Sequence, residues 1–268
     1  MGRLMAANLQ KAGFALRSYD VNDSGNCKSV AEAAVGAEVL LTMLPDGRAV
    51  RKAVLAAAPK LKKGTIVLDM SSADPLGTRR LAKELSKRGI SLVDAPVSGA
   101  RTGARDATLC IIVGGDKRSF DEVRPLLQKL GEKIFHVGPV GAGHALKALN
   151  NYIGASGTIA AFEALLVGKA FGLDPALMVE VFNASTGYNS TTQRKIPRDV
   201  LTNAFASGFS AALMTKDIGI AANLARNQRV PAKYLGATLK MWKAALGKLP
   251  SGADHTEMYR YLESLTRQ

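Results

Sequence analysis

The chain has 268 residues, of which 47% are hydrophobic and 22% charged, as in ordinary globular proteins, so wholesale disorder is excluded. This length suits one large domain or two modest ones. Lys and Arg outnumber Asp and Glu by 36 to 22, but the basic residues are dispersed and aromatic residues make up only 6%. We therefore expect solvated helix faces that attract an anionic substrate, and no nucleic-acid interface.

Targeting and metal signals are also missing from the sequence. No apolar run approaches the ~18 residues of a membrane span, and Met1–Met5 does not lead into the core of a signal peptide. Cys27 and Cys110 lie far apart without metal-ligand spacing, and the three histidines form no metal pattern. We expect a soluble, cytoplasmic protein without a membrane partner, a metal or a disulfide.

The first half of the chain alternates short apolar runs with amphipathic stretches. Helices are expected between the runs, for example over 3–12, over 75–88 with Pro75 in the first turn, and over 119–130. This alternation predicts a mainly parallel α/β sheet covered on both faces. The predicted strands are 14–20, 38–43, 64–69, 90–94, 109–115 and 133–137.

After the glycine-rich segment 138–143 no strand is expected. A long apolar helix is predicted from about His144 to Gly172, and further helices over 175–184, 211–226, 231–246 and 254–265. We expect a Rossmann-type α/β domain over 1–139 and an all-α domain over 140–268. The apolar long helix suits a homodimer or homotetramer interface, and burial within one chain explains its composition equally well.

The opening of the chain reads as the second half of a dinucleotide-binding unit. Gly2 directly precedes a helical pattern, where a pyrophosphate would meet free helix N–H groups. Asp20 follows 18 residues later, near the offset of a carboxylate that binds the ribose hydroxyls, which favours NAD over NADP. The unit's first strand and its first two glycines are expected upstream of Met1, so either the start lies roughly ten residues earlier or the enzyme is compromised.

Two further segments carry chemistry. Ser98 and Gly99 follow a predicted strand, and their hydroxyl and amide groups could hold a carboxylate, although a loop without a ligand explains them too. Lys147 and Asn151 share one helix face among apolar neighbours. Such surroundings lower the pKa of a lysine and suit it to proton transfer, whereas the alternative is a lysine that extends to solvent beside an exposed amide.

These motifs together resemble the β-hydroxyacid dehydrogenases, the group that contains 3-hydroxyisobutyrate dehydrogenase and tartronate semialdehyde reductase. In order and spacing the matching segments cover nearly the whole chain. They are the cofactor helix, the substrate loop, the catalytic helix and a late Lys-Asp motif, at residues 1–9, 94–109, 141–151 and 209–218.

The resemblance implies a hydride transfer between NAD and a small 3-hydroxy acid or its semialdehyde. Lys147 would be the general acid/base, and Asn151 would position the reacting oxygen. Ser98, Gly99 and the backbone of Ala100 would bind the substrate carboxylate. The residues implied in cofactor binding are Gly2, Asp20, Met43, Leu44, Pro45, Ser72 and Lys216, and Lys216 would also close over the substrate.

The chain departs from the family pattern at two positions. Ala100 and Ala107 stand where the family usually has glycine, and we expect a changed pocket shape rather than lost activity. Segment 186–192 is polar and lies where the family's helical domain approaches the substrate. Its composition favours a polar acid over 3-hydroxyisobutyrate, although a simple helix–helix loop would look the same.

Three other functions compete with this interpretation. An imine reductase would share the architecture but would generally lack Lys147, and a 6-phosphogluconate dehydrogenase would need a much longer chain. A non-catalytic or truncated relative that serves as a binding module fits the net charge of +14. It gives no reason for Lys147 and Asn151.

Overall fold

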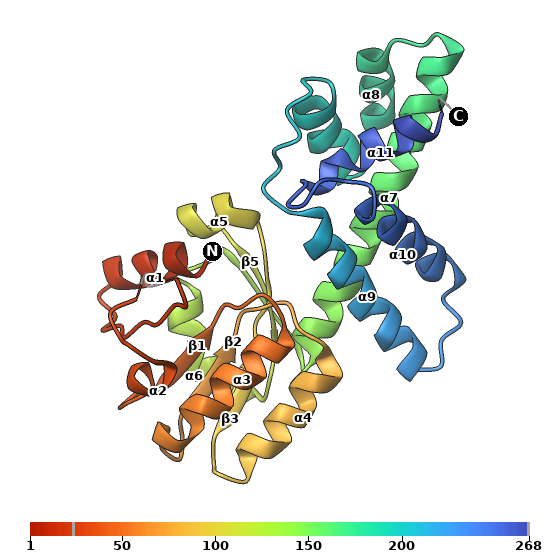
Figure 1. Cartoon of the computed structure of the whole chain (residues 1–268). Coiled ribbons are helices and arrows are strands. Elements are labelled where there is room, and N and C mark those ends of the chain that lie inside the picture. The colour runs from red at the N-terminus through yellow and green to blue at the C-terminus, as the bar shows by residue number, and fades with distance from the viewer. Residues whose placement is uncertain (23–24, 267–268) are drawn as a thin grey trace. The chain divides into compact units, whose positions relative to one another are not determined.

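The computed structural model describes residues 1–22 and 25–266. It divides into two compact units, Met1–Lys147 and Ala148–Gln268. The first unit is a sheet with helices, and the second is helical (Figure 1). The expected combination of a Rossmann-type α/β domain and a helical domain is confirmed.

The sheet of the first unit has six strands in the order β1-β2-β3-β5-β4, with β6 paired to β5. β1 to β3 are parallel, as are β5 and β6, whereas β5 runs antiparallel to β3 and β4. The sheet is therefore mixed, and the short strand β4 was not predicted. The bounds are β1 Val39–Thr42, β2 Ile66–Asp69, β3 Ser91–Asp94, β4 Val97–Ser98, β5 Cys110–Gly114 and β6 Lys133–Gly138.

The strand predicted over 14–20 is wrong. This segment has no helix or strand, and most of its residues are exposed. Its polar contacts go to a nearby loop, because Cys27 N donates to Ser18 O and Asn26 Nδ2 donates to Leu16 O. An apolar run becomes a strand only when its backbone groups pair with a neighbouring strand, and among the described residues none pairs with it.

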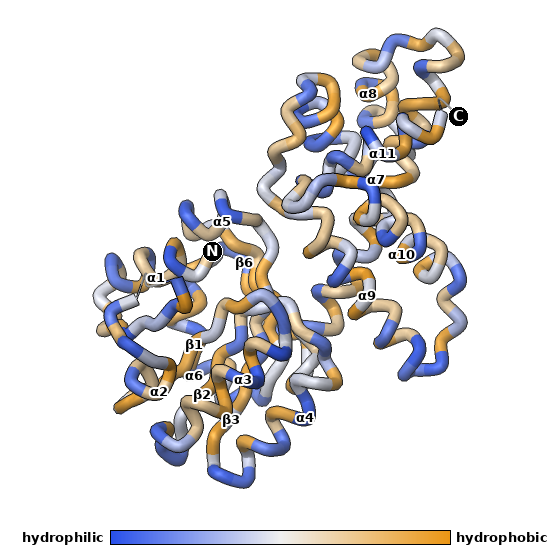
Figure 2. Tube along the Cα trace, viewed as in Figure 1, coloured by the Kyte–Doolittle hydropathy of each residue, from blue (hydrophilic) through white to orange (hydrophobic). Residues whose placement is uncertain are grey.

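The strands are mostly in the hydrophobic colour of Figure 2, and buried apolar side chains pack on both faces of the sheet. Val67 and Leu92 face one core with α3 and α4, while Leu68 and Val93 face the other with α1 and α6. The alternation follows from the two-residue period of a strand. The helices of this unit are α1 Gly2–Lys11, α2 Val30–Ala33, α3 Gly47–Ala57, α4 Pro75–Ser86, α5 Ala100–Asp106 and α6 Lys117–Leu127, with a 3₁₀ turn at Ala58–Lys60.

The second unit packs its helices around Phe162 and Trp242, both fully buried. Its elements include a π-helix at Thr191–Val200, a rare form that often marks functional positions. The first helix, α7, begins in the first unit and continues into the second. The bounds are α7 Ala142–Phe171, α8 Pro175–Ala184, α9 Ala211–Asn227, α10 Lys233–Leu246, a 3₁₀ turn His255–Glu257 and α11 Met258–Leu265.

Among the described residues, α7 is the one helix whose length and composition would allow it to cross a bilayer. An 18-residue window of α7 has a mean hydropathy of 1.2, and 44% of that window is buried inside the structure. A helix in the core of a folded domain has the same composition, so this finding is weak support for a membrane span.

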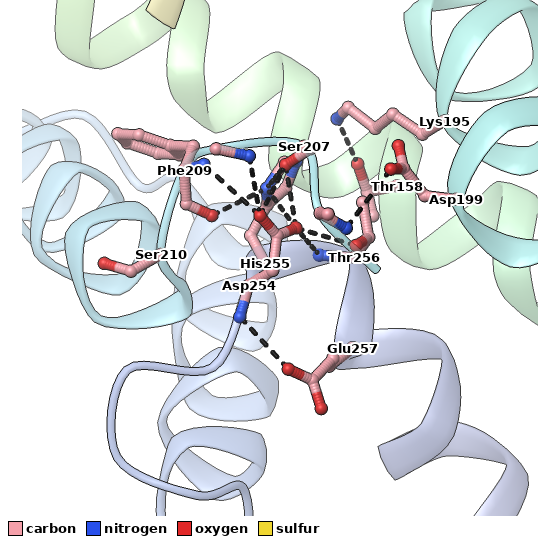
Figure 3. A network of polar contacts seen from close by, with 12 residues as sticks. Thr158, Lys195, Asp199, Ser207, Phe209, Ser210, Asp254, His255, Thr256 and Glu257 are labelled. Carbon is pink, nitrogen blue, oxygen red and sulfur yellow. Dashed lines mark hydrogen bonds and ion pairs between the residues drawn. The ribbon is translucent and has the colours of Figure 1, made fainter. Parts of the chain in front are cut away.

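Asp254 joins segments of the second unit that are far apart in sequence (Figure 3). Its carboxylate accepts hydrogen bonds from Ser207 Oγ at 2.7 and 2.9 Å, Gly208 N at 2.9 Å and Thr256 N at 3.0 Å. Burial acts to raise the pKa of Asp254, but hydrogen bonds from His255, Thr256 and Ser207 outweigh it and hold that pKa well below its usual range.

This lowered pKa makes an acid-dependent contribution to stability. A carboxylate with a lower pKa in the folded state stabilises the fold above its unfolded pKa of about 3.9, and the contribution disappears as the pH falls through the folded pKa. We expect Asp254→Asn to lower the free energy of unfolding at about pH 7 by about 1–3 kcal/mol, and by less at about pH 3. Urea unfolding at both pH values measures this. An equal loss at both would contradict it.

Candidate active site

Polar side chains align across the sheet where three parallel strands end. Thr42, Asp69 and Asp94 are register partners on β1, β2 and β3, and all are buried. Thr42 Oγ1 donates to Asp69 Oδ1 at 2.9 Å, and Ser71 N donates to the same oxygen at 3.0 Å. Ligands of open α/β sheets bind outside the carboxyl ends of strands, so this row lies at the edge where a cofactor site is expected.

Asp94 connects that edge to the start of α7. One carboxylate oxygen accepts from Gly141 N at 2.6 Å, and the other accepts from His144 N at 2.8 Å. The first N–H groups of a helix have no partner inside the helix, so the carboxylate satisfies donors at this helix start. Burial raises the pKa of Asp94, although His144 and the two backbone hydrogen bonds act to lower it.

His144 fixes the same helix turn through its ring. Its Nδ1 lies 2.8 Å from Thr78 Oγ1, and its Nε2 lies 3.0 Å from Ser71 O. A carbonyl oxygen only accepts, so Nε2 carries a hydrogen. The ring also approaches Asp69 Oδ2 at 3.7 Å and Asp94 Oδ2 at 3.9 Å. The first turn of α7 is therefore held by the ends of β2 and β3 and by α4.

Glycine is required where α7 approaches the sheet. A Cβ on Gly143 would lie 2.5 Å from Ile112 O and 2.9 Å from Asp94 Oδ2. Both contacts are closer than real Cβ atoms make, and one of the atoms is backbone. Any side chain at this position would push the helix away from Asp94.

Lys147 lies one turn after His144 on α7 and is buried, with 7% of its surface exposed. A lysine is rarely buried to this degree unless its ammonium group has polar partners. Because the first turn of α7 is fixed by Asp94 and His144, the backbone of Lys147 is fixed relative to the sheet edge of its own unit.

In the second unit, Asn151 and Lys216 meet at the carboxylate of Asp217. Asn151 Nδ2 donates to Asp217 Oδ2 at 2.6 Å, and Lys216 Nζ lies 3.2 Å from Asp217 Oδ1. Asp217 is buried on α9, whereas the Lys216 side chain is 27% exposed. The sequence analysis named Asn151 and Lys216 but gave no role to Asp217. Its place directly after Lys216 in the late Lys-Asp motif of residues 209–218 was the available signal.

The predicted substrate loop forms β4 and the start of α5. Ser98 is half-buried at the end of β4, and Gly99 has φ +133°, a conformation that favours glycine. Gly99 precedes α5, and a Cβ added to it would lie 3.2 Å from Leu109 Cδ2. The loop follows Asp94 directly, so one carboxylate anchors both the strand that leads to Ser98 and the helix that carries Lys147.

The two alanines that replace the family's glycines both adopt left-handed backbone conformations. Ala100 has φ +53° and Ala107 has φ +56°, where Ala107 ends α5. An L-residue pays roughly 1–2 kcal/mol for this conformation, and glycine does not. The substitutions thus change backbone energy at the two ends of one short helix.

Ala107→Gly should raise the free energy of unfolding by up to about 1 kcal/mol, because relief of the strained φ exceeds the entropy that glycine adds to the unfolded chain. The matched control is Ala104→Gly in the same helix, which is buried and should lose at least about 1 kcal/mol. Denaturant midpoints measure both. Destabilisation by Ala107→Gly similar to that of the control would contradict the strain argument.

The residues of the first unit that are expected at the cofactor lie in two groups. A Cβ on Gly2, the first residue of α1, would lie 3.6 Å from Met43 Cβ, so the start of α1 lies beside the loop after β1. Leu44 N donates to Ser71 Oγ at 2.9 Å, which joins the segment of Met43, Leu44 and Pro45 to that of Ser72. Asp20 is exposed, and it accepts hydrogen bonds from Asn22 N and Nδ2 at 2.9 and 3.1 Å.

Within residues 1–22 and 25–266, no cluster of His, Cys, Asp and Glu has the arrangement of a metal site. The polar groups at the sheet edge are instead donors and acceptors of a hydrogen-bond network. The residues that could hold a dinucleotide are those at the start of α1 and in the loops after β1 and β2.

Two family models match the chain. The NAD-binding domain of 6-phosphogluconate dehydrogenase matches residues 1–138, and the NAD-binding domain of NADP-dependent 3-hydroxyisobutyrate dehydrogenase matches residues 141–262. Together they cover nearly all of the chain, one on each side of the start of α7.

Relatives of full length carry the same signal. A 2-(hydroxymethyl)glutarate dehydrogenase of Eubacterium barkeri is 33% identical, with 99% of this chain and 93% of the relative covered. An NAD-dependent L-serine dehydrogenase of Pseudomonas aeruginosa is 36% identical over 84% of this chain and 82% of its own. The structure of 3-hydroxyisobutyrate dehydrogenase of Mycobacterium tuberculosis with L-serine has a TM-score of 0.91 at 30% identity, covering 98% and 95% of the two chains.

These similarities confirm the predicted resemblance and the NAD-dependent dehydrogenase interpretation over the imine reductase and the non-catalytic alternatives. NAD is the supported cofactor, with NADP the lesser option. The chain belongs to the β-hydroxyacid dehydrogenase family, whose members are NAD(P)-dependent oxidoreductases that act on hydroxyl groups.

Proposed function

We propose that this enzyme oxidises the hydroxyl group of a small 3-hydroxy acid, or reduces the matching semialdehyde, with Lys147 as general acid/base. One observation carries the proposal. The Asp94 carboxylate anchors both the strand that leads to Ser98 and the helix turn that precedes Lys147. A group for the substrate carboxylate and a group for the hydroxyl proton are thus held by one buried residue.

In the oxidation, Lys147 Nζ would accept the proton of the hydroxyl group while a hydride leaves the carbon that bears this group, so the alcohol becomes a carbonyl group. The nicotinamide, when bound, supplies the hydride acceptor. Ser98 Oγ and the amides of Gly99 and Ala100 bind the substrate carboxylate. Asn151, oriented by Asp217, directs its amide to the reacting oxygen. Lys216 would contact the cofactor and close over the substrate.

The sheet edge of the first unit fits a dinucleotide. The small Gly2 lets a pyrophosphate approach the free N–H groups at the start of α1. Met43, Leu44, Pro45 and Ser72 would line the nucleotide, since their segments are joined by the Leu44–Ser71 hydrogen bond.

Asp20 is proposed to accept hydrogen bonds from the ribose hydroxyls and to repel a 2′-phosphate. Asp20→Ala should therefore reduce the preference for NAD over NADP by roughly tenfold, through weaker NAD binding and stronger NADP binding. Kd values for both cofactors from calorimetry measure this. An unchanged ratio would mean that another residue binds the ribose.

The activity is tested by following NADH absorbance with a panel of acids, including 3-hydroxyisobutyrate, L-serine and 2-(hydroxymethyl)glutarate. These three correspond to the names of the relatives described above. We expect turnover with NAD of at least one acid that carries a 3-hydroxyl group. Binding of NAD without turnover of any of them would contradict the proposed reaction.

We also propose a homodimer or homotetramer. Ile153, Val167 and Phe171 are 70%, 70% and 82% exposed on one α7 stripe, with exposed alanines between them. An apolar stripe of this size marks a partner surface, and a second copy of the same helix matches its spacing. Light scattering should give a multiple of the 28.3 kDa chain mass, reduced to the monomer mass by Val167→Glu.

A cytoplasmic location suits the two free thiols, Cys27 and Cys110.

A further inference from the structure

Lys195 lies on the π-helix and points to α7 in the second unit (Figure 3). Its Nζ donates to Thr158 Oγ1 at 3.0 Å. Thr158 Oγ1 is itself 2.8 Å from Thr191 Oγ1 and donates to Gly154 O at 2.8 Å. Both threonines are buried and Lys195 is half-buried. The ammonium group therefore donates to a neutral hydroxyl group in a largely buried position.

No carboxylate among the described residues lies within ion-pair distance of Lys195. The acidic charges that act to raise its pKa are Asp254 and Asp199, and both are already engaged. Asp199 pairs with Arg198 at 2.9 Å, and Asp254 accepts the hydrogen bonds described above. Burial, followed by the charge of Arg194, lowers the pKa of Lys195 to about 8. An ammonium group in this state would be stabilised by an anionic ligand.

Thr158, the partner of Lys195, lies on the face of α7 that also carries Lys147. Residues four, seven and eleven positions after Lys147 share its helix face, and these are Asn151, Gly154 and Thr158. Asn151 and Thr158 are separated by about 10 Å along the axis, since a helix rises 1.5 Å per residue. Between them, a Cβ on Gly154 would meet no described atom within 4 Å, so this part of the face is open.

We propose that Lys195, with Thr158, binds a second carboxylate at the far end of the substrate, so that the substrate class is 3-hydroxy dicarboxylic acids. The inference rests on the proposed function, because it places the hydroxyl group at Lys147 and Asn151. An arm of about two or three carbons, with a hydrogen bond at each end, is comparable to the separation of Asn151 and Thr158.

The test compares two acids with the same carbon chain, 2-(hydroxymethyl)glutarate and 2-(hydroxymethyl)pentanoate, which differ by the distal carboxylate. In Lys195→Gln, which keeps a hydrogen-bond donor and removes the charge, kcat/KM for the diacid should fall roughly 10- to 100-fold. The value for the monoacid should change less than about threefold. Lys195→Arg, which keeps the charge, should retain most of the preference for the diacid.

The matched control is Lys169→Gln. Lys169 Nζ also donates to a neutral hydroxyl, that of Tyr259, but it is paired with Glu263 as well. This variant should leave the ratio of the two kcat/KM values unchanged. The proposal would be overturned if Lys195→Gln left the ratio of the two kcat/KM values unchanged, whether or not both values fall. A purely structural lysine does not distinguish the acids.

A binding measurement separates this proposal from the proposed reaction. Glutarate has two carboxylates and no hydroxyl group, so it binds without turnover, and pentanoate is its monoanionic counterpart. With the wild-type protein saturated with NAD, glutarate should raise Tm more than pentanoate, and Lys195→Gln should remove the difference. If no acid is turned over but this dependence holds, the reaction fails and the anion site stands. If glutarate acts equally on both proteins, the anion site fails.

Discussion

Lys147→Ala should lower kcat by about 10²- to 10⁴-fold, which is the usual contribution of a positioned general acid/base. The affinity for NAD should change little, because the residues expected at the dinucleotide lie at the start of α1 and in the loops after β1 and β2. Steady-state kinetics with the best acid of the panel, together with calorimetry for NAD, measure both quantities. Full activity in this variant would contradict the proposed role of Lys147 as general acid/base.

A loss of activity could also come from a disturbed helix, and two measurements separate the causes. Lys169→Ala removes another lysine of α7 that is exposed, and it should keep wild-type kcat. An added primary amine should restore part of the activity of Lys147→Ala, because it supplies the missing base. Rescue together with an unchanged Tm assigns the loss to proton transfer.

Asp94→Asn should destabilise the protein by about 2–4 kcal/mol and lower kcat at least about tenfold. The two carboxylate oxygens accept N–H groups of Gly141 and His144, and the amide of asparagine can accept only one of them. The other backbone N–H then faces an NH₂ group inside a buried site. We expect the start of α7 to move away from β3, and Lys147 to move with it.

Asp116→Asn is the matched control, since Asp116 also accepts a helix-start N–H, that of Ser119 at 2.9 Å, but is exposed. Asparagine caps a helix start about as well as aspartate, so Asp116→Asn removes only the charge and should cost about 0.3–1 kcal/mol, without an effect on kcat. Denaturant unfolding and kcat of both variants decide the point. If Asp94→Asn costs no more than Asp116→Asn, the buried connection does not hold α7 in place.

Local pattern sufficed for much of the fold. The strands β1, β2, β3, β5 and β6 lie within the predicted runs or extend them by a residue, because the strands of this sheet are short, largely apolar runs bounded by turns. Helical periodicity by itself put Lys147 and Asn151 on one face of α7. The strand expected over 14–20 failed because strand formation depends on a partner strand, which a local pattern does not contain.

The connections of the candidate site were decided by the tertiary structure. Asp94 reaches Gly141 across 47 positions of sequence, Asn151 reaches Asp217 across 66, and Lys195 reaches Thr158 across 37. No spacing rule links such residues, because packing of separate elements brings them together. The sequence thus determined the family, the two kinds of domain and the candidate acid/base. Only the tertiary structure decided which buried charges hold those groups, since burial and long-range hydrogen bonds exist only once the chain has folded.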